Sequence, residues 1–169
     1  MVNTTITEND IWQVLATVND PEVPVLSILD LGIVRNVTIF QGPDEKGFYG
    51  KIAITPTYSG CPAMDVISLQ IKLSLAEHNI PPISIIQQLS PAWTTDWMSE
   101  AGKQKLVAYG IAAPIGKAID QINLEALEIP CPQCNSINTR LISQFGSTAC
   151  KALFQCNDCK EPFDYFKCH

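Results

Sequence analysis

The sequence predicts an α+β protein in which a small two-layer domain is followed by a C-terminal unit organised around a metal ion. Apolar residues recur at helical spacing in two N-terminal segments and at alternate positions in the segments beside them. Two Cys-x-x-Cys pairs stand near the C-terminus. We therefore predict an α+β domain at residues 1–110, a linker at 111–130 and a metal-bound domain at 131–169.

The first domain is predicted to run in the order helix, hairpin, helix, strand. Thr7 is placed to cap the first helix, and Asp20-Pro21 ends it, because proline cannot continue a helix interior. The expected elements are a helix at about 8–18, hairpin strands at 33–41 and 48–55, a helix at about 61–77, a strand at 83–89 and a short helix at 99–109. This order favours helices packed on one small sheet.

The two cysteine pairs have nearly the spacing of a structural zinc site. Each pair supplies two corners of a tetrahedron, and 21 residues separate them, against roughly 15–20 in typical sites. The alternative is two disulfides or four unrelated core thiols. A segment of 39 residues cannot bury enough apolar surface to fold alone, so the metal would form its core. With strands expected at 138–144, 151–155 and 161–166, the unit is predicted to be a zinc ribbon. Its predicted ligands are Cys131, Cys134, Cys156 and Cys159.

Two further cysteines, Cys150 and Cys168, leave the ligand set open. Either could replace a member of the quartet, the two could form an auxiliary pair beside it, or both could be buried thiols on the strands. Tetrahedral sulfur suits iron as well as zinc, although short knuckles with polar flanks favour Zn²⁺.

Composition and charge restrict the classes of partner. Residues 1–130 carry seven Lys/Arg against fourteen Asp/Glu, a net −7, and residues 131–169 carry four against three, a net +1. Neither part has the clustered basic face that nucleic-acid binding requires, so that role is disfavoured. The first ten residues are polar, and no apolar run is long enough for a membrane span. With seven cysteines in metal-type spacing, we expect a cytoplasmic protein without membrane association.

A lone cysteine, Cys61, stands where a strand is expected to lead into a helix. If Pro62 is the first helical residue, Cys61 is the N-cap, and the unpaired N–H groups there stabilise a thiolate. Gly60 would allow a tight turn, and Thr57 and Ser59 could donate hydrogen bonds to the sulfur. A small buried residue that merely caps the helix is the equal alternative.

The acidic and basic neighbours of Cys61 decide what kind of chemistry it supports. Of the two histidines, His78 lies at the far end of the same helix, roughly 25 Å away, and His169 is terminal, so a Cys-His hydrolase is poorly supported. Asp20, Glu22 and Asp30 are expected at the same end of the domain, where carboxylates would raise a thiol pKa. Asp20-Pro21-Glu22 alternatively forms no more than a turn.

An aromatic segment also has two interpretations. Trp93 and Trp97, with Met98, could form a surface for a partner or an apolar ligand. The other interpretation, slightly favoured, makes them part of the core at the sheet edge.

The motifs at 20–24, 30–34 and 55–62 resemble those of the metal–sulfur cluster biosynthesis family, small α+β proteins that act in iron–sulfur cluster assembly. The segments 143–153 and 161–168 are similar to the family of D proteins of bacterial phenylacetyl-CoA epoxidase systems, and the likeness extends from about residue 8 to 169.

This resemblance implies an accessory role in aerobic phenylacetate degradation, in maturing or maintaining an epoxidase. Its partners would be a reductase with a flavin and a two-iron, two-sulfur cluster, and the di-iron oxygenase subunits. The chain itself has no Glu-x-x-His pair for a di-iron bundle and no glycine-rich dinucleotide motif. Alternatives are a stoichiometric non-catalytic subunit, a thiol enzyme using Cys61, and a nucleic-acid-binding ribbon.

Cys61 takes the position of the family's reactive cysteine, which the resemblance implies is a cluster-ligating thiol. One thiolate cannot hold a cluster that needs four ligands. A transient iron–sulfur cluster on Cys61 would therefore need a second protomer in a homodimer, a client cysteine or a small thiol.

Overall fold

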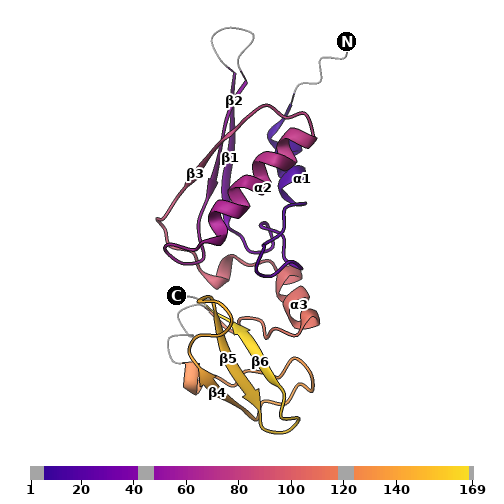
Figure 1. The fold of residues 1–169 in the computed structure, drawn as a ribbon, viewed down its shortest axis with the longest axis vertical. Coiled ribbons are helices and arrows are strands. Elements are labelled where there is room, and N and C mark those ends of the chain that lie inside the picture. Colours follow the sequence, from indigo (N-terminus) through magenta and orange to yellow (C-terminus); the bar gives the residue numbers. More distant parts are fainter. Residues whose placement is uncertain (1–5, 42–47, 118–123, 168–169) are drawn as a thin grey trace.

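The computed structural model describes residues 6–41, 48–117 and 124–167, and Figure 1 shows an α/β body followed by a small all-β unit. The body contains the sheet β1-β2-β3, and the C-terminal unit contains the sheet β4-β5-β6. Helices α1 and α2 lie side by side against the first sheet, and α3 lies where the body meets the second sheet. This arrangement confirms the predicted fold class, an α+β domain followed by a ribbon.

Helix α1, Glu8–Leu15, begins at the cap that the sequence predicts. The Thr7 hydroxyl accepts a hydrogen bond from the Asp10 N–H, and the Asp10 carboxylate accepts one from the Thr7 N–H. The helix ends three residues earlier than predicted. The N–H groups of Thr17 and Val18 bond to carbonyls three residues back, at 3.0 and 3.2 Å, so the last turn tightens out of α-helical geometry.

The first sheet consists of the predicted hairpin and one later strand. β1, Val34–Gln41, pairs antiparallel with β2, Phe48–Ile54. β3, Ser84–Gln87, pairs parallel with β2, which places α2 as the crossover between them. β3 is shorter than the predicted 83–89, although Ile83 is buried beneath the sheet.

Helix α2, Ala63–Glu77, presents the predicted apolar stripe to the core. Met64, Ile67, Ile71 and Leu75 are all buried. Because the helix begins at Ala63, one residue later than predicted, Pro62 is its N-cap residue and Cys61 precedes the cap. Pro62 already has helical dihedral angles, so the difference is within one residue of the predicted start.

The aromatic segment belongs mainly to the core. Trp93 and Met98 are buried, which confirms the core interpretation for these two residues. Trp97, in the 3₁₀ turn Thr95–Trp97, is partly exposed, and the Arg35 guanidinium lies 3.5 Å from the centre of its ring. Helix α3, Glu100–Tyr109, follows, capped by Ser99 as predicted and ended by the left-handed Gly110.

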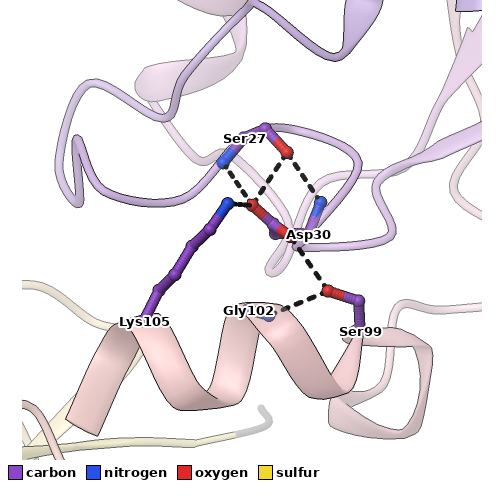
Figure 2. A network of polar contacts seen from close by, with 5 residues as sticks. All are labelled: Ser27, Asp30, Ser99, Gly102 and Lys105. Carbon is purple, nitrogen blue, oxygen red and sulfur yellow. Dashed lines mark hydrogen bonds and ion pairs between the residues drawn. The ribbon is translucent and has the colours of Figure 1, made fainter. Parts of the chain in front are cut away.

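A polar network attaches α3 to the body, and Asp30 is its centre (Figure 2). The Asp30 carboxylate accepts hydrogen bonds from the Ser27 N–H and hydroxyl, from the Ser99 hydroxyl at 3.0 Å, and from Lys105 Nζ at 2.6 Å. Gly102 permits this approach, because a Cβ there would lie 2.9 Å from Asp30 Cβ. Burial alone would raise the pKa of Asp30, but the hydrogen bonds from Lys105, Ser27 and Ser99 outweigh it and lower the pKa to about 2.

The C-terminal unit is an antiparallel ribbon. β4, Thr139–Ser143, pairs with β5, Lys151–Cys156, and β5 pairs with β6, Pro162–Phe166. A one-turn 3₁₀ helix, Leu124–Ala126, precedes them. All three strands lie within one residue of the predicted ranges, apart from a slightly shorter β6 and β4.

The ribbon packs directly against the body. Ala112, in the predicted linker, donates to the Asp164 carbonyl at 2.8 Å and accepts from the Phe166 N–H at 3.0 Å, so it extends the ribbon sheet by a short bridge. Phe166 is buried in the core of the body, with its ring 6.1 Å from that of Trp93 in an edge-to-face arrangement. The predicted domain boundaries at 110 and 130 stay predictions, but the two units share packed side chains.

Within the described ranges, none of the helices has the length and apolar character needed to cross a lipid bilayer.

Candidate functional site

The four predicted zinc ligands converge on one point in the ribbon. The Sγ atoms of Cys131 and Cys159 are 3.7 Å apart, those of Cys134 and Cys156 are 3.6 Å apart, and all four lie within 4.8 Å of one another. A regular tetrahedron with Zn–S bonds of about 2.3 Å has edges of about 3.8 Å. The quartet therefore fits a single tetrahedral ion. It is too compact for a multi-iron cluster, in which thiolates bind different irons and stand farther apart.

The two knuckles have the same local geometry, which explains why both pairs aim inward. Cys131 donates its N–H to the Ser136 carbonyl at 2.9 Å, and Cys156 donates to the Glu161 carbonyl at 3.0 Å, five residues on in each case. In each knuckle, the residue after the second cysteine has a positive φ, 59° at Asn135 and 69° at Lys160. These turns direct backbone N–H groups at the sulfurs, which favours thiolates.

A hydrogen-bonded bridge holds the two knuckles together. The Asp158 carboxylate in the second knuckle accepts from the Ser136 hydroxyl and from Asn138 Nδ2, the latter at 2.8 Å. Cys131 and Cys156 are fully buried, whereas Cys134 and Cys159 are exposed. Because sulfur fills all four positions, an ion here would have no open coordination position, and it would serve structure rather than catalysis.

The remaining ribbon cysteines are outside this quartet. Cys150 precedes β5, and instead of facing the knuckles it contacts the body: its thiol lies 3.0 Å from the Thr148 hydroxyl and donates to Glu22 Oε2 at 3.9 Å. It is 4% exposed and belongs to the core of the body. Cys168 lies outside the described residues.

Cys61 lies on the loop that enters α2, as predicted, and is partly exposed. Its N–H donates to the Tyr58 carbonyl at 3.3 Å, and its carbonyl accepts from the Met64 N–H, so the thiol is held at the end of a tight turn. Gly60 has a φ of +78°, with open space where a Cβ would be, which supports its predicted role in the turn.

The environment of Cys61 does not activate its thiol. Burial raises the pKa of Cys61, and the carboxylates of Glu22 and Asp20 raise it further. Hydrogen bonds from the Ala63 N–H and the Tyr58 hydroxyl act in the opposite direction, but the pKa stays above its ordinary value. The helix start thus contributes as expected yet is outweighed, and the thiol is neutral at pH 7.

The predicted supporting residues divide into two groups. Asp20 and Glu22 face the thiols, with the Asp20 carboxylate also accepting hydrogen bonds from the Glu22 and Val23 N–H groups at 2.8 and 2.7 Å. Asp30 instead anchors α3 through Lys105. Burial raises the pKa of both Asp20 and Glu22, and the charge of Lys151 partly offsets the effect. The structure therefore combines both sequence interpretations of this segment, a turn and a neighbour of Cys61.

A small cavity of about 210 Å³ adjoins the Cys61 loop. Thr57 and Ser59, predicted as donors to the sulfur, line this cavity, together with Trp93. Thr55 also lines it. Its hydroxyl oxygen, on a residue only 1% exposed, has no hydrogen-bond partner in the described part of the chain.

Sequence reasoning missed Tyr58 and the proximity of Cys150 and Lys151. Tyr58 lies three residues before Cys61 in the 55–62 motif, and a hydroxyl near the thiol could have been suspected from that position. Burial, the hydrogen bond with Cys61, and the charges of Cys61, Glu22 and Cys150 raise the pKa of Tyr58 to about 12. The position of Cys150 depends on packing between the two units, for which the sequence has no local signal.

Comparisons with known proteins match both parts of this site. The family model described as "Iron-sulfur cluster assembly protein" matches residues 8–79, and "PaaD zinc beta ribbon domain" matches 117–167. The D subunit of the 1,2-phenylacetyl-CoA epoxidase of Escherichia coli (strain K12) is 48% identical over 95% of this chain and 92% of its own. The Fe-S protein maturation auxiliary factor of Porphyromonas gingivalis (strain ATCC BAA-308 / W83) is 36% identical, over 59% of this chain and 90% of its own.

A solved structure agrees with these matches. The crystal structure of a domain of unknown function, DUF59, from Bacillus anthracis is 29% identical, with a TM-score of 0.51. It covers 59% of this chain and 90% of that one.

Proposed function

We propose, for a chain that belongs to the family of the 1,2-phenylacetyl-CoA epoxidase D proteins, an accessory role in assembling or maintaining the epoxidase's metal centres. Relatives of the N-terminal part are named as Fe-S protein maturation auxiliary factors, which supports iron–sulfur assembly as the activity. The clients would be the reductase with its two-iron, two-sulfur cluster and the di-iron oxygenase subunits.

The observation that carries the proposal is the position of Cys61. It is a partly exposed thiol inside the segment matched by the iron–sulfur assembly model, held by a tight turn at the start of α2. Soft thiolate ligands suit iron in clusters. The thiol stays protonated until a metal displaces the proton, which suits a transient ligand better than a nucleophile. A thiol enzyme is correspondingly disfavoured.

In this proposal the ribbon holds structural zinc and serves as a docking module. Its quartet fits one tetrahedral ion, and its net charge of +1 disfavours nucleic acid as the docked partner. The proposal places the protein in the reducing cytoplasm, where four free thiolates remain available to the metal.

Replacing Cys61 with Ser tests the function. Epoxidase components produced with the Cys61→Ser variant should contain far less reductase cluster than those produced with the parent chain, while the circular dichroism and zinc content of the variant stay unchanged. Ser59→Ala, an exposed change on the same loop, is the matched control and should mature the reductase normally. Normal cluster content with Cys61→Ser would refute the proposal.

The second candidate is a stoichiometric, non-catalytic subunit of the epoxidase. The name of the Escherichia coli relative, which includes the word subunit, favours it. Copurification distinguishes the two, because a subunit remains with the purified oxygenase in fixed ratio, whereas an assembly factor leaves once the centre is formed.

A further inference from the structure

The contact between body and ribbon brings a second thiol to the neighbourhood of Cys61. Cys150 comes from the start of β5 in the ribbon, yet it packs into the core of the body, and Cys61 packs against the same core. Both thiols face the same carboxylates, since the charges of Glu22 and Asp20 act on each of them. Tyr58 links the pair: its hydroxyl bonds to Cys61, and it lies within range of the charge of Cys150.

The surroundings of Cys150 are unusual for a thiol that only fills space. A buried cysteine normally behaves as a small apolar residue. Here, the thiol at 4% exposure donates a hydrogen bond to the Glu22 carboxylate at 3.9 Å and contacts the Thr148 hydroxyl at 3.0 Å. Placing a carboxylate beside buried thiols is unfavourable for each of them in the ionised state. A bound cation would remove that penalty for all of them together.

We propose that Cys61 and Cys150 together hold an iron–sulfur fragment between the body and the ribbon. This inference rests on the proposed function and names the second ligand that Cys61 needs. Each thiol releases a proton as its Fe–S bond forms, and Glu22 is the first acceptor beside Cys150. No electrons are transferred, so no oxidant is required. Two coordination positions stay available for client or small-molecule thiols.

The spacing of the two thiols agrees with an iron–sulfur fragment rather than a single tight ion. Among the described residues, the ribbon quartet is the group gathered closely enough to enclose one ion, and Cys61 with Cys150 is not part of such a group. In a cluster, the two thiolates bind different irons and stand farther apart. The partly exposed Cys61 would face the client, and the buried Cys150 would anchor the fragment.

The test is anaerobic reconstitution of the full chain, with zinc already in the ribbon, by ferrous iron and sulfide. The parent chain should take up iron and sulfide with visible charge-transfer absorption. Cys61→Ser and Cys150→Val should each lower that uptake at least tenfold. Valine keeps the packing volume at 150, and an unchanged melting temperature would show that the interface is intact. Tyr58→Phe, which touches the site but keeps both thiols, is the control and should load normally.

A second measurement tests the pairing without iron. A trivalent arsenical binds two neighbouring thiols far more tightly than one, so peptide mapping of the zinc-loaded chain should find it across Cys61 and Cys150. A bridge between Cys150 and Cys168, or uptake by Cys150→Val equal to that of the parent, would overturn the inference. If Cys150→Val also matures the reductase normally while Cys61→Ser does not, the proposed function stands without the inference. If neither change matters for maturation, both are wrong.

Discussion

Removing the charge of Asp30 should detach α3 energetically from the body, and the size of the effect can be worked out from the network in Figure 2. The residue is 8% exposed, and its carboxylate binds Lys105, Ser27 and Ser99. Asn at this position keeps the shape but loses the charge-assisted bonds. It also directs an N–H₂ group at donors that need an acceptor.

The lowered pKa of Asp30 sets the magnitude. Going from an ordinary value of 3.8 to about 2 corresponds to about 2 kcal/mol of stabilisation of the charged form in the folded state. The Lys105 side chain is 48% exposed, so solvent and salt screen part of this interaction. We therefore expect Asp30→Asn to lower the free energy of unfolding by about 1–2 kcal/mol.

The same helix supplies the matched control. Lys103 and Glu100 form an ion pair at 2.8 Å, but the Glu100 side chain is 81% exposed, so Glu100→Gln should cost at most about 0.5 kcal/mol. Urea unfolding of the zinc-loaded chain, followed by tryptophan fluorescence, measures both. Lys105→Met completes a double-mutant cycle with Asp30→Asn. If Asp30→Asn costs no more than Glu100→Gln, the assigned role of the network is wrong.

The effect should also depend on pH in one direction. The folded-state pKa of Asp30 is depressed, so its contribution is complete above the unfolded value near 4 and is lost as pH falls toward about 2. The difference between the parent and Asp30→Asn should therefore shrink between about pH 4 and pH 2. Comparing the two chains at each pH cancels the acid release of zinc, which affects both.

Three further changes test the packing and the metal. Gly102→Ala should destabilise by about 1–3 kcal/mol in urea unfolding, because its Cβ would lie 2.9 Å from Asp30 Cβ; a gain of about 1 kcal/mol from helix propensity would contradict the close approach. Cys131→Ser should abolish stoichiometric zinc and the near-UV dichroism of the ribbon, and a variant that keeps one tightly bound zinc would show that the quartet is not the site. Phe166→Ala should cost about 3–5 kcal/mol, since the buried ring packs on Trp93; a cost under about 1 kcal/mol would mean that body and ribbon do not share a core.

Local patterns were sufficient to predict most of the elements and the ribbon. The cap at Thr7, the apolar stripe from Met64 to Leu75 and the spacing of the four knuckle cysteines each depend on neighbours within one or two turns. The structure differs mainly at element ends. Helix α1 stops at Leu15, where 3₁₀-type bonds replace the α-helical pattern without changing the burial of Val18.

The chemistry around Cys61 was less predictable, because it depends on contacts between distant segments. The sequence grouped Asp20, Glu22 and Asp30, but only a three-dimensional arrangement decides that Asp30 binds Lys105 while the other two face the thiols. Cys150 is 89 positions after Cys61, and nothing in the local pattern of a ribbon strand indicates that its thiol meets another domain. Periodicity predicts which face is buried, not what it is buried against.

One strand connects the two sulfur sites, and this connection gives the ribbon a reason to be part of an assembly protein. β5 begins directly after Cys150 and ends at Cys156, one of the four knuckle ligands, a span of about 20 Å for six residues. A unit this small is ordered by its metal, so zinc binding supplies the free energy that fixes β5. The same binding therefore positions Cys150 beside Glu22 and Cys61. Zinc occupancy of the ribbon and iron occupancy at the interface are thereby thermodynamically linked, although no ligand is shared between them.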